Sequence, residues 1–340
     1  MLVTGQHPRL DLDDHQLGGF AAHRLEIAGA ENPHAHVARV TAALVPLLRH
    51  APELLFVQGD TSSALGAALA AFTAGVPVAH VEAGLRTWDP ALPWPEEEYR
   101  TAIDAQADLL FAPTETAAAN LRVEGVPGSI HVTGNTGIDA LLELETRLPP
   151  RARREATVGR VLVTCHRREN WGDGLNSIAE ALVQLASPDV DIEMIMPPNP
   201  HVRRRITKLL GSRAGVRLIA PCSHPELVAR MRDADLVMSD SGGMQEEAPA
   251  LGVPMLVLRE KTERPEGIAT GNALLVGTST RAIVEAARRI LADPVERAQM
   301  AKPALPYGDG RASQRIAEIV ERWLCMSRSE PKNLRLRNSL

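Results

Sequence analysis

Polar and glycine residues that could bind a charged ligand follow an apolar run in the stretch DLVMSDSGGMQEEAPALGVPMLVL, residues 235–258. The run ends at Ser241 and a Gly-Gly pair, and a helix-like segment follows. Two glycines allow a ligand to approach the backbone closely, and the start of a helix attracts an anion such as a phosphate. Glu246 and Glu247 come within a turn of this position. They either complement the helix dipole or accept hydrogen bonds from sugar hydroxyls.

A second cluster with anion-binding chemistry lies in RVLVTCHRRENWGDG, residues 160–174. A buried strand is expected to end at His166, and two arginines follow. Arginine offers forked hydrogen bonds and histidine a titratable donor, so this sequence suits a diphosphate. The alternative is a salt-bridge cluster with Glu169 at a helix start. Arg264, held before Pro265, follows another predicted strand.

Carboxylates dominate the same positions in the first half of the chain. Asp60 ends the predicted strand in LLFVQGD, where it caps the next helix, takes part in catalysis, or does both. Alternation along a strand places His80 and Glu82 on one face, with Glu82 at the carboxyl end. His80-x-Glu82 could bind a metal, but the sequence offers no second ligand group. Two prolines predict a fixed loop that presents Glu96–Glu98, although three consecutive acids are also typical of a solvated surface.

Short apolar runs alternate with longer Ala/Leu-rich segments, a pattern that indicates parallel sheets covered by helices on both faces. The sequence predicts two doubly wound α/β domains that face a central cleft, with a boundary in RLPPRARREATVGR, residues 147–160. We expect domains at 1–150 and 151–326 and a polar tail at 327–340. The predicted strands are Leu2–Thr4, Leu54–Gln58, Val76–Val81, Leu109–Ala112, Ile130–Thr133, Arg160–Cys165, Ile192–Met196, Val216–Ile219, Leu236–Ser239, Met255–Leu258 and Ala273–Val276.

Composition argues against several classes of function. A net charge of −5 provides no basic field for nucleic acid, and ten aromatic residues do not suit a platform for stacking bases. Three scattered cysteines suit a reducing compartment and show no clustered metal-ligand spacing. The sequence begins with no signal-peptide pattern, and the most apolar window, residues 64–81, reads as a buried helix and strand. We therefore expect a cytoplasmic globular protein that does not bind membranes.

The two halves carry different chemistry at their predicted strand ends. The first half carries carboxylic acids at these positions. The second half carries hydrogen-bond donors that could bind an anion and a carboxylate suited to ribose hydroxyls. This division predicts a nucleotide-diphosphate sugar as ligand, with the diphosphate on the second domain and the sugar facing the first.

Eight motifs, taken together and in this order, resemble those of the non-hydrolysing UDP-N-acetylglucosamine 2-epimerases over residues 1–325. They are GDTSSALGAALAAF, HVEAGLRT, PWPEEEYR, TGNTGIDAL, VTCHRREN, SDSGGMQEEAPALGVP, TERPEGIATG and LPYGDG. The resemblance implies a two-domain fold shared with many nucleotide-sugar glycosyltransferases, a homodimer, and no cofactor. It also implies interconversion of UDP-N-acetylglucosamine and UDP-N-acetylmannosamine through a glycal, for surface polysaccharide precursors.

The resemblance further implies roles for individual residues. Asp60, Glu82 and Glu96 match the family's catalytic carboxylates, and His166 matches a histidine that contacts the leaving UDP. The matches to UDP-binding residues, with the close-approach glycine added, are Ser241, Gly242, Gly243, Glu247 and Arg264. Gln6 and His7 match part of an activating site for a second UDP-sugar. None of these matches involves a metal.

The sequence departs from the family pattern in several places. It begins at the family's second strand, so the first βα unit of the first domain, with its G-T-R-P-E-type turn, is missing. Tyr99 replaces an asparagine, and Leu227 stands where an aromatic residue often stacks on uracil. The alternatives are an epimerase or hydrolysing relative for a related 2-acetamido UDP-sugar, a glycosyltransferase of the same architecture, and a nucleotide-sugar-binding relative with weakened or absent catalysis.

Overall fold

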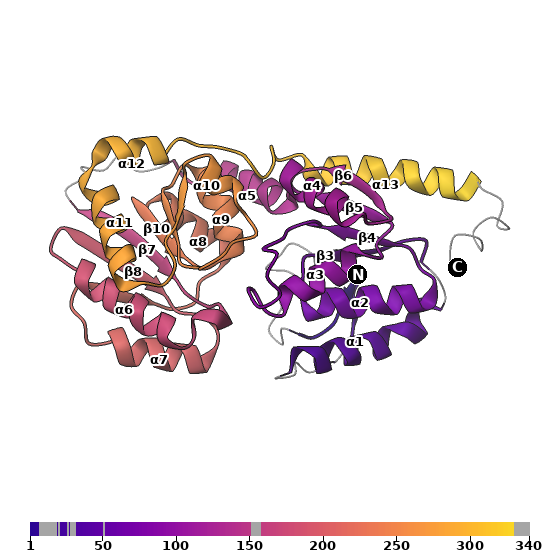
Figure 1. Ribbon diagram of the computed structural model, residues 1–340, viewed down its shortest axis with the longest axis horizontal. Helices are drawn as coiled ribbons and strands as arrows, with labels where there is room; N and C mark the ends of the chain where they lie inside the picture. The colour runs from indigo at the N-terminus through magenta and orange to yellow at the C-terminus, as the bar shows by residue number, and fades with distance from the viewer. Residues whose placement is uncertain are drawn as a thin grey trace. The chain divides into compact units, whose positions relative to one another are not determined.

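The computed structural model describes residues 1–6, 19, 21–25, 27, 32–49, 52–150 and 158–329. The chain forms two compact units. Unit 1 comprises Met1–Thr133 and the chain from Ser313 onward, and unit 2 comprises Gly134–Ala312. Both are parallel α/β structures, which confirms the predicted fold class (Figure 1).

The sheet of unit 2 is doubly wound, with the strand order β12-β11-β10-β7-β8-β9. One face packs against α6, α7 and α11, and the other packs against α5, α8 and α9. The elements of unit 2 are α5 (Thr136–Arg147), β7 (Gly159–Thr164), the 3-10 helix η1 (Arg168–Asn170), α6 (Asp173–Leu185), β8 (Val190–Ile195), α7 (Pro200–Leu210), β9 (Val216–Ile219), α8 (His224–Arg232), β10 (Leu236–Ser239), α9 (Gly242–Leu251), β11 (Met255–Val257), α10 (Glu266–Ala269), β12 (Ala273–Leu275), α11 (Thr280–Ala292) and α12 (Pro294–Met300).

Unit 1 contains two separate sheets within the described residues, one of β1 and β2 and one in the order β3-β4-β5-β6. Helices α1 to α4 pack on one face of the larger sheet, and α13 covers the other. The elements of unit 1 are β1 (Leu2–Val3), β2 (His23–Arg24), α1 (Pro33–Leu48), β3 (Leu55–Gln58), α2 (Ser62–Ala74), β4 (Val78–Val81), α3 (Glu96–Asp104), β5 (Leu109–Ala112), α4 (Glu115–Glu124), β6 (Ser129–Val132) and α13 (Ala312–Ser329).

Among the described strands only β4 pairs with β3, so β3 lies at a sheet edge. The side chain of Phe56 on this strand is half exposed, at 49%.

Two helices belong to different units from those that the sequence predicts. Ile138 and Leu141 of α5 are buried in the core of unit 2, whereas Ile316 and Val320 of α13 pack on the sheet of unit 1. The expected tail at 327–340 is also wrong at its start, because α13 continues to Ser329. None of the helices within the described ranges combines the length and apolar character needed to cross a membrane.

Candidate active site

The strand order of unit 2 changes direction between β7 and β10, and ligands of open α/β sheets bind at the carboxyl ends of strands at such a point. His166 follows β7, and Asp240 and Ser241 follow β10. The structure therefore brings together two of the segments that the sequence predicts for anion binding.

Asp240 organises the loop that carries His166, and sequence reasoning missed this role. Its buried carboxylate accepts hydrogen bonds from the backbone N–H groups of His166 (3.1 Å) and Arg167 (2.9 Å) and from the amide of Asn170 (3.0 Å). Burial alone would raise the pKa of Asp240, but the His166 imidazole and these N–H groups outweigh it, and the pKa is lowered. His166 Nδ1 lies 3.2 Å from Asp240, while the His166 side chain remains 45% exposed. An imidazole held in this way presents its other nitrogen outward.

The alternative interpretation of this loop is a salt-bridge cluster with Glu169 at a helix start, and Glu169 does lie in the first turn of η1. Glu169 pairs with the buried Arg259, at 2.9 Å. Arg168 lies over the ring of Trp171, 5.8 Å from its centroid.

Helix α9 begins at the predicted Gly-Gly pair, with Ser241 as its N-cap. Neither glycine has a positive φ, so they are not needed for a left-handed turn. A Cβ at position 242 would lie 2.7 Å from Nη1 of Arg264, whereas a Cβ at 243 would meet no atom within 4 Å. Gly242 is thus required for packing, and Gly243 leaves open space beside the helix start.

Arg264 lies in a buried network of carboxylates. Its Nε donates to Glu246 at 2.6 Å, and its Nη1 contacts Glu263 closely. Glu246 also accepts from Asn135 Nδ2 at 2.6 Å. These contacts place Arg264 beneath the start of α9 and give Glu246 a structural role, which leaves Glu247 as the carboxylate suited to a ribose.

Glu247 is partly exposed and already has a protein partner. Its carboxylate lies 2.7 Å from Nε2 of His224, the first residue of α8. The hydrogen bond to Glu247 raises the pKa of His224, against a smaller opposing effect of burial. The sequence did not indicate this pair, because 23 residues separate His224 from Glu247.

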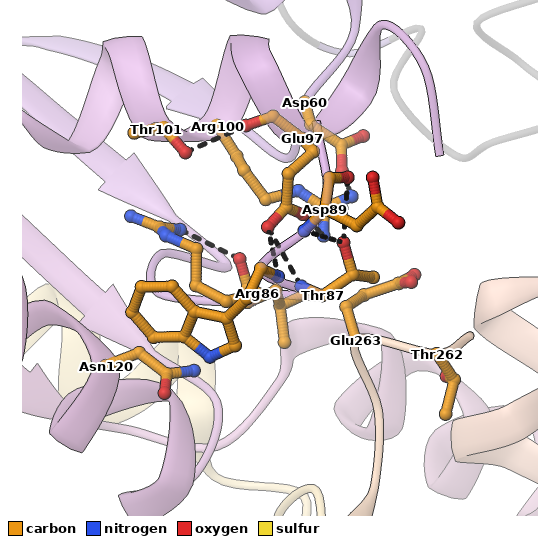
Figure 2. A network of polar contacts seen from close by, with 12 residues as sticks. Asp60, Arg86, Thr87, Asp89, Glu97, Arg100, Thr101, Asn120, Thr262 and Glu263 are labelled. Carbon is orange, nitrogen blue, oxygen red and sulfur yellow. Dashed lines mark hydrogen bonds and ion pairs between the residues drawn. The ribbon is translucent and has the colours of Figure 1, made fainter. Parts of the chain in front are cut away.

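In unit 1, Asp60 follows β3 and pairs with Nη2 of the buried Arg100 (Figure 2). The expectation that Asp60 caps the next helix is wrong, because the cap of α2 is Thr61, whose hydroxyl accepts from Ala64 N at 3.1 Å. The carboxylate of Asp60 is therefore not used to cap α2 and pairs with Arg100. Arg100 is a further functional candidate that the sequence motif contains but our reasoning overlooked.

Glu82 follows β4 in a left-handed conformation, with φ +69°. This conformation is uncommon for a residue with a Cβ and ends the strand alternation at Val81, so the predicted shared face of His80 and Glu82 is wrong. A Cβ on Gly59 would lie 3.5 Å from Oε2 of Glu82. The carboxylate thus reaches over the backbone at the end of the neighbouring strand β3.

Glu96–Glu98 do not lie in a loop, as predicted, but form the first turn of α3. Acids are favourable at a helix N-terminus, which explains the difference. Glu97 is buried and accepts from the N–H groups of Thr87 and Trp88, both at 2.9 Å, so it fixes the preceding turn (Figure 2). Glu96 is half-buried, and Glu98 is exposed.

The metal alternative for His80-x-Glu82 does not fit the geometry. Both ring nitrogens of the buried His80 have partners, Asp104 at 2.6 Å and the carbonyl of Gly59 at 2.9 Å. No group of three or more His, Cys, Asp or Glu in the described part of the chain is arranged to hold a metal ion.

Gln6, a candidate for the activating site, accepts a hydrogen bond from the hydroxyl of Ser63 at 2.6 Å, beside the start of α2. His7 lies outside the described residues.

Comparison with known proteins identifies the family to which the chain belongs. The sequence model described as UDP-N-acetylglucosamine 2-epimerase matches residues 1–321. The enzyme of that name from Escherichia coli K12 is 43% identical over 298 residues, which cover 83% of this chain and 79% of the relative. A crystal structure of UDP-GlcNAc 2-epimerase from Neisseria meningitidis bound to UDP-GlcNAc has a TM-score of 0.84 and 36% identity, covering 92% of this chain and 87% of that one.

A third relative, from Methanocaldococcus jannaschii, was solved in complex with UDP-GlcNAc and UDP. It has a TM-score of 0.81 and 31% identity, covering 94% of this chain and 90% of that chain. These similarities extend over both units of the fold. The chain belongs to the UDP-N-acetylglucosamine 2-epimerase family.

Proposed function

We propose that this chain interconverts UDP-N-acetylglucosamine and UDP-N-acetylmannosamine without net hydrolysis. The observation that carries the proposal is the family match combined with three carboxylates of unit 1: Asp60 after β3, Glu82 after β4 and Glu96 in the first turn of α3. Unit 2 would bind UDP, with the diphosphate at the start of α9 and beside His166. The product would supply precursors of mannosamine-containing surface polysaccharides.

The proposed reaction is an elimination followed by an addition. One carboxylate removes the C2 proton while the C1–O bond to UDP breaks, and the two electron pairs leave a C1=C2 double bond and free UDP. A second acid then protonates C2 from the opposite face, and UDP re-forms the C1–O bond. Carboxylates suit both proton transfers, and the N–H groups of α9 and His166 suit the departing diphosphate.

His166 contributes through its contact with Asp240. The Asp240 carboxylate fixes the orientation of the imidazole, so that its other nitrogen can donate a hydrogen bond to the β-phosphate as negative charge develops there. Arg100 pairs with Asp60 and holds its carboxylate in place at the end of β3. In this proposal, residues of unit 2 stabilise the leaving group, and residues of unit 1 transfer the protons.

An NMR time course with UDP-N-acetylglucosamine in deuterated water tests the proposal. We expect deuterium at C2 and the appearance of the manno epimer, while the total UDP-sugar stays constant. Accumulation of free UDP would instead support a hydrolysing relative. An unchanged spectrum, with UDP binding retained, would support a binding protein and contradict the proposal.

Two neighbouring acids offer a matched pair for the carboxylates. Glu96→Gln should lower kcat by about two to four orders of magnitude, the range for a lost acid or base. Glu98→Gln changes an exposed acid of the same helical turn and should leave kcat unchanged. Equal effects of the two substitutions would remove Glu96 from the proposed mechanism.

A further inference from the structure

A buried ion cluster lies beneath the two strand ends that carry Asp60 and Glu82. Nδ1 of His80 is 2.6 Å from Oδ1 of Asp104, and Oδ2 of Asp104 is 2.8 Å from Nη1 of Arg86. The side chains of His80 and Asp104 are 0% exposed. The guanidinium of Arg86 continues the cluster outward to Glu124, at 2.5 Å.

The hydrogen bonds of this cluster define its charge. Nε2 of His80 lies 2.9 Å from the carbonyl oxygen of Gly59, which can only accept, so Nε2 carries a proton. Nδ1 faces an Asp104 carboxylate that also accepts from Arg86 and from the N–H of Gly84. With His80 as an imidazolium, the cluster contains two positive and two negative charges and is neutral, as burial requires.

The electrostatics agree with this assignment. Burial would lower the pKa of His80, but the Asp104 carboxylate outweighs it, and the pKa is raised. Burial would likewise raise the pKa of Asp104, but His80 and Arg86 lower it. The carboxylate of Asp60 makes a smaller contribution to the raised pKa of His80.

Each member of the central pair holds the backbone next to one candidate catalytic carboxylate. His80 donates to the carbonyl of Gly59, the residue before Asp60. Asp104 accepts the N–H of Gly84 at 3.0 Å, two residues after Glu82. The turn at 82–84 needs such support, because Glu82 has φ +69° and Gly84 has φ +83°.

We propose that His80 and Asp104 are positioning residues that, through the Gly59 carbonyl and the Gly84 N–H, fix the carboxylates of Asp60 and Glu82 relative to each other. This inference rests on the proposed function, since it assumes that both carboxylates act on the sugar. Misplacing a catalytic group by about 1 Å costs on the order of 100-fold in rate. The cluster should therefore influence kcat without contacting the substrate.

Kinetics of two histidine variants test the positioning role. His80→Gln should lower kcat about 10- to 100-fold, while KM and the Kd for UDP stay within about threefold, because only transition-state interactions are lost. His131→Gln makes the same change at a partly exposed histidine of unit 1 and should leave kcat, KM and the Kd for UDP unchanged. A folded His80→Gln protein with the kcat of the unmodified chain would overturn the inference.

A second variant and a spectroscopic measurement keep the test independent of folding and of activity. Asp104→Asn preserves the shape of the pair but removes the charge that holds His80 protonated. We expect ¹⁵N NMR to show both His80 nitrogens protonated near pH 7 in the unmodified chain, and one in Asp104→Asn. A neutral His80 in the unmodified chain would contradict the ion cluster, even if epimerisation is observed. Absence of epimerisation by the unmodified chain would instead contradict the proposed function.

Discussion

Adjacent residues of the same type have different roles at the start of α9. Glu246 is 4% exposed and joins Arg264 and Asn135 in a buried network, whereas Glu247 faces the surface and His224. A carboxylate buried against a guanidinium cannot be removed without leaving an uncompensated charge. The sequence alone could not separate these two acids, since both lie within one turn of the Gly-Gly pair. The distinction depends on partners far away in the chain.

Gly242 and Gly243 offer a similar contrast, which leads to the first prediction. Gly243→Val should abolish UDP binding but leave the fold intact, because the added side chain meets no protein atom and occupies the space beside the helix start. Gly242→Val should instead lower the melting temperature, because its Cβ would collide with Arg264. Calorimetry with UDP and thermal denaturation measure the two effects. Undiminished UDP affinity of Gly243→Val would remove this helix start from the proposed site.

The pair between His224 and Glu247 predicts a pH dependence of UDP binding. Glu247 must exchange His224 for the ribose, and His224 is an imidazolium below its raised pKa, where the pair is strongest. Raising the pH through this pKa weakens the pair, so the His224 contribution to UDP affinity should increase with pH. The gain should be about two- to fivefold, as for a partly exposed ion pair worth up to about 1 kcal/mol.

His224→Gln isolates this contribution, because the variant leaves all other ionisable groups of the protein and of UDP in place. Calorimetry between about pH 5.5 and 8.5 should show that the affinity of the unmodified chain increases more steeply with pH than that of the variant. Parallel curves for the two proteins would mean that His224 does not compete with ribose.

At the scale of elements, sequence reasoning located the strands well and the side-chain networks poorly. Predicted and observed strands agree within a few residues, because a continuous apolar run between turn residues is a strong local signal. Strand β2 was missed because both of its residues are exposed and it is only two residues long. Helix α3 was interpreted as a loop because two prolines precede it. The partners of His80 and Glu97 depend on tertiary packing, which spacing does not reveal.

The exposed edge of β3 predicts association between molecules. Phe56 on this edge strand is 49% exposed. Unpaired strand edges with apolar side chains promote aggregation, and a lysine at such an edge opposes it. Phe56→Lys should therefore reduce concentration-dependent aggregation, measured by light scattering on heating.

A control for this prediction is Val123→Lys, which replaces a side chain that is 78% exposed on α4, away from the sheet edge. It adds the same charge and removes a comparable apolar surface. A similar reduction in aggregation for both variants would assign the effect to net charge and contradict a role of the β3 edge.

At the scale of the whole molecule, the chain passes from unit 1 to unit 2 and back, so the boundaries of units and of sequence halves differ. Helix α5 comes before the expected boundary but belongs to the core of unit 2. Helix α13 comes at the end of the described chain but covers the sheet of unit 1. Both helices are amphipathic, and an apolar face does not specify the sheet on which it packs. Unit 1 therefore cannot complete its core until α13 has been synthesised.

This arrangement predicts that a change in α13 destabilises unit 1 rather than unit 2. Val320 is 8% exposed and packs with Ala79, Val81 and Phe111. Val320→Asp would bury an unpaired charge and should cost on the order of 3 kcal/mol. Hydrogen exchange should then accelerate in β4 and β5 and stay unchanged in β7 and β10. Ala317→Asp places the same charge on an exposed position of α13 and should leave exchange unaltered. Faster exchange in β7 and β10 of Val320→Asp would show that α13 stabilises unit 2 instead.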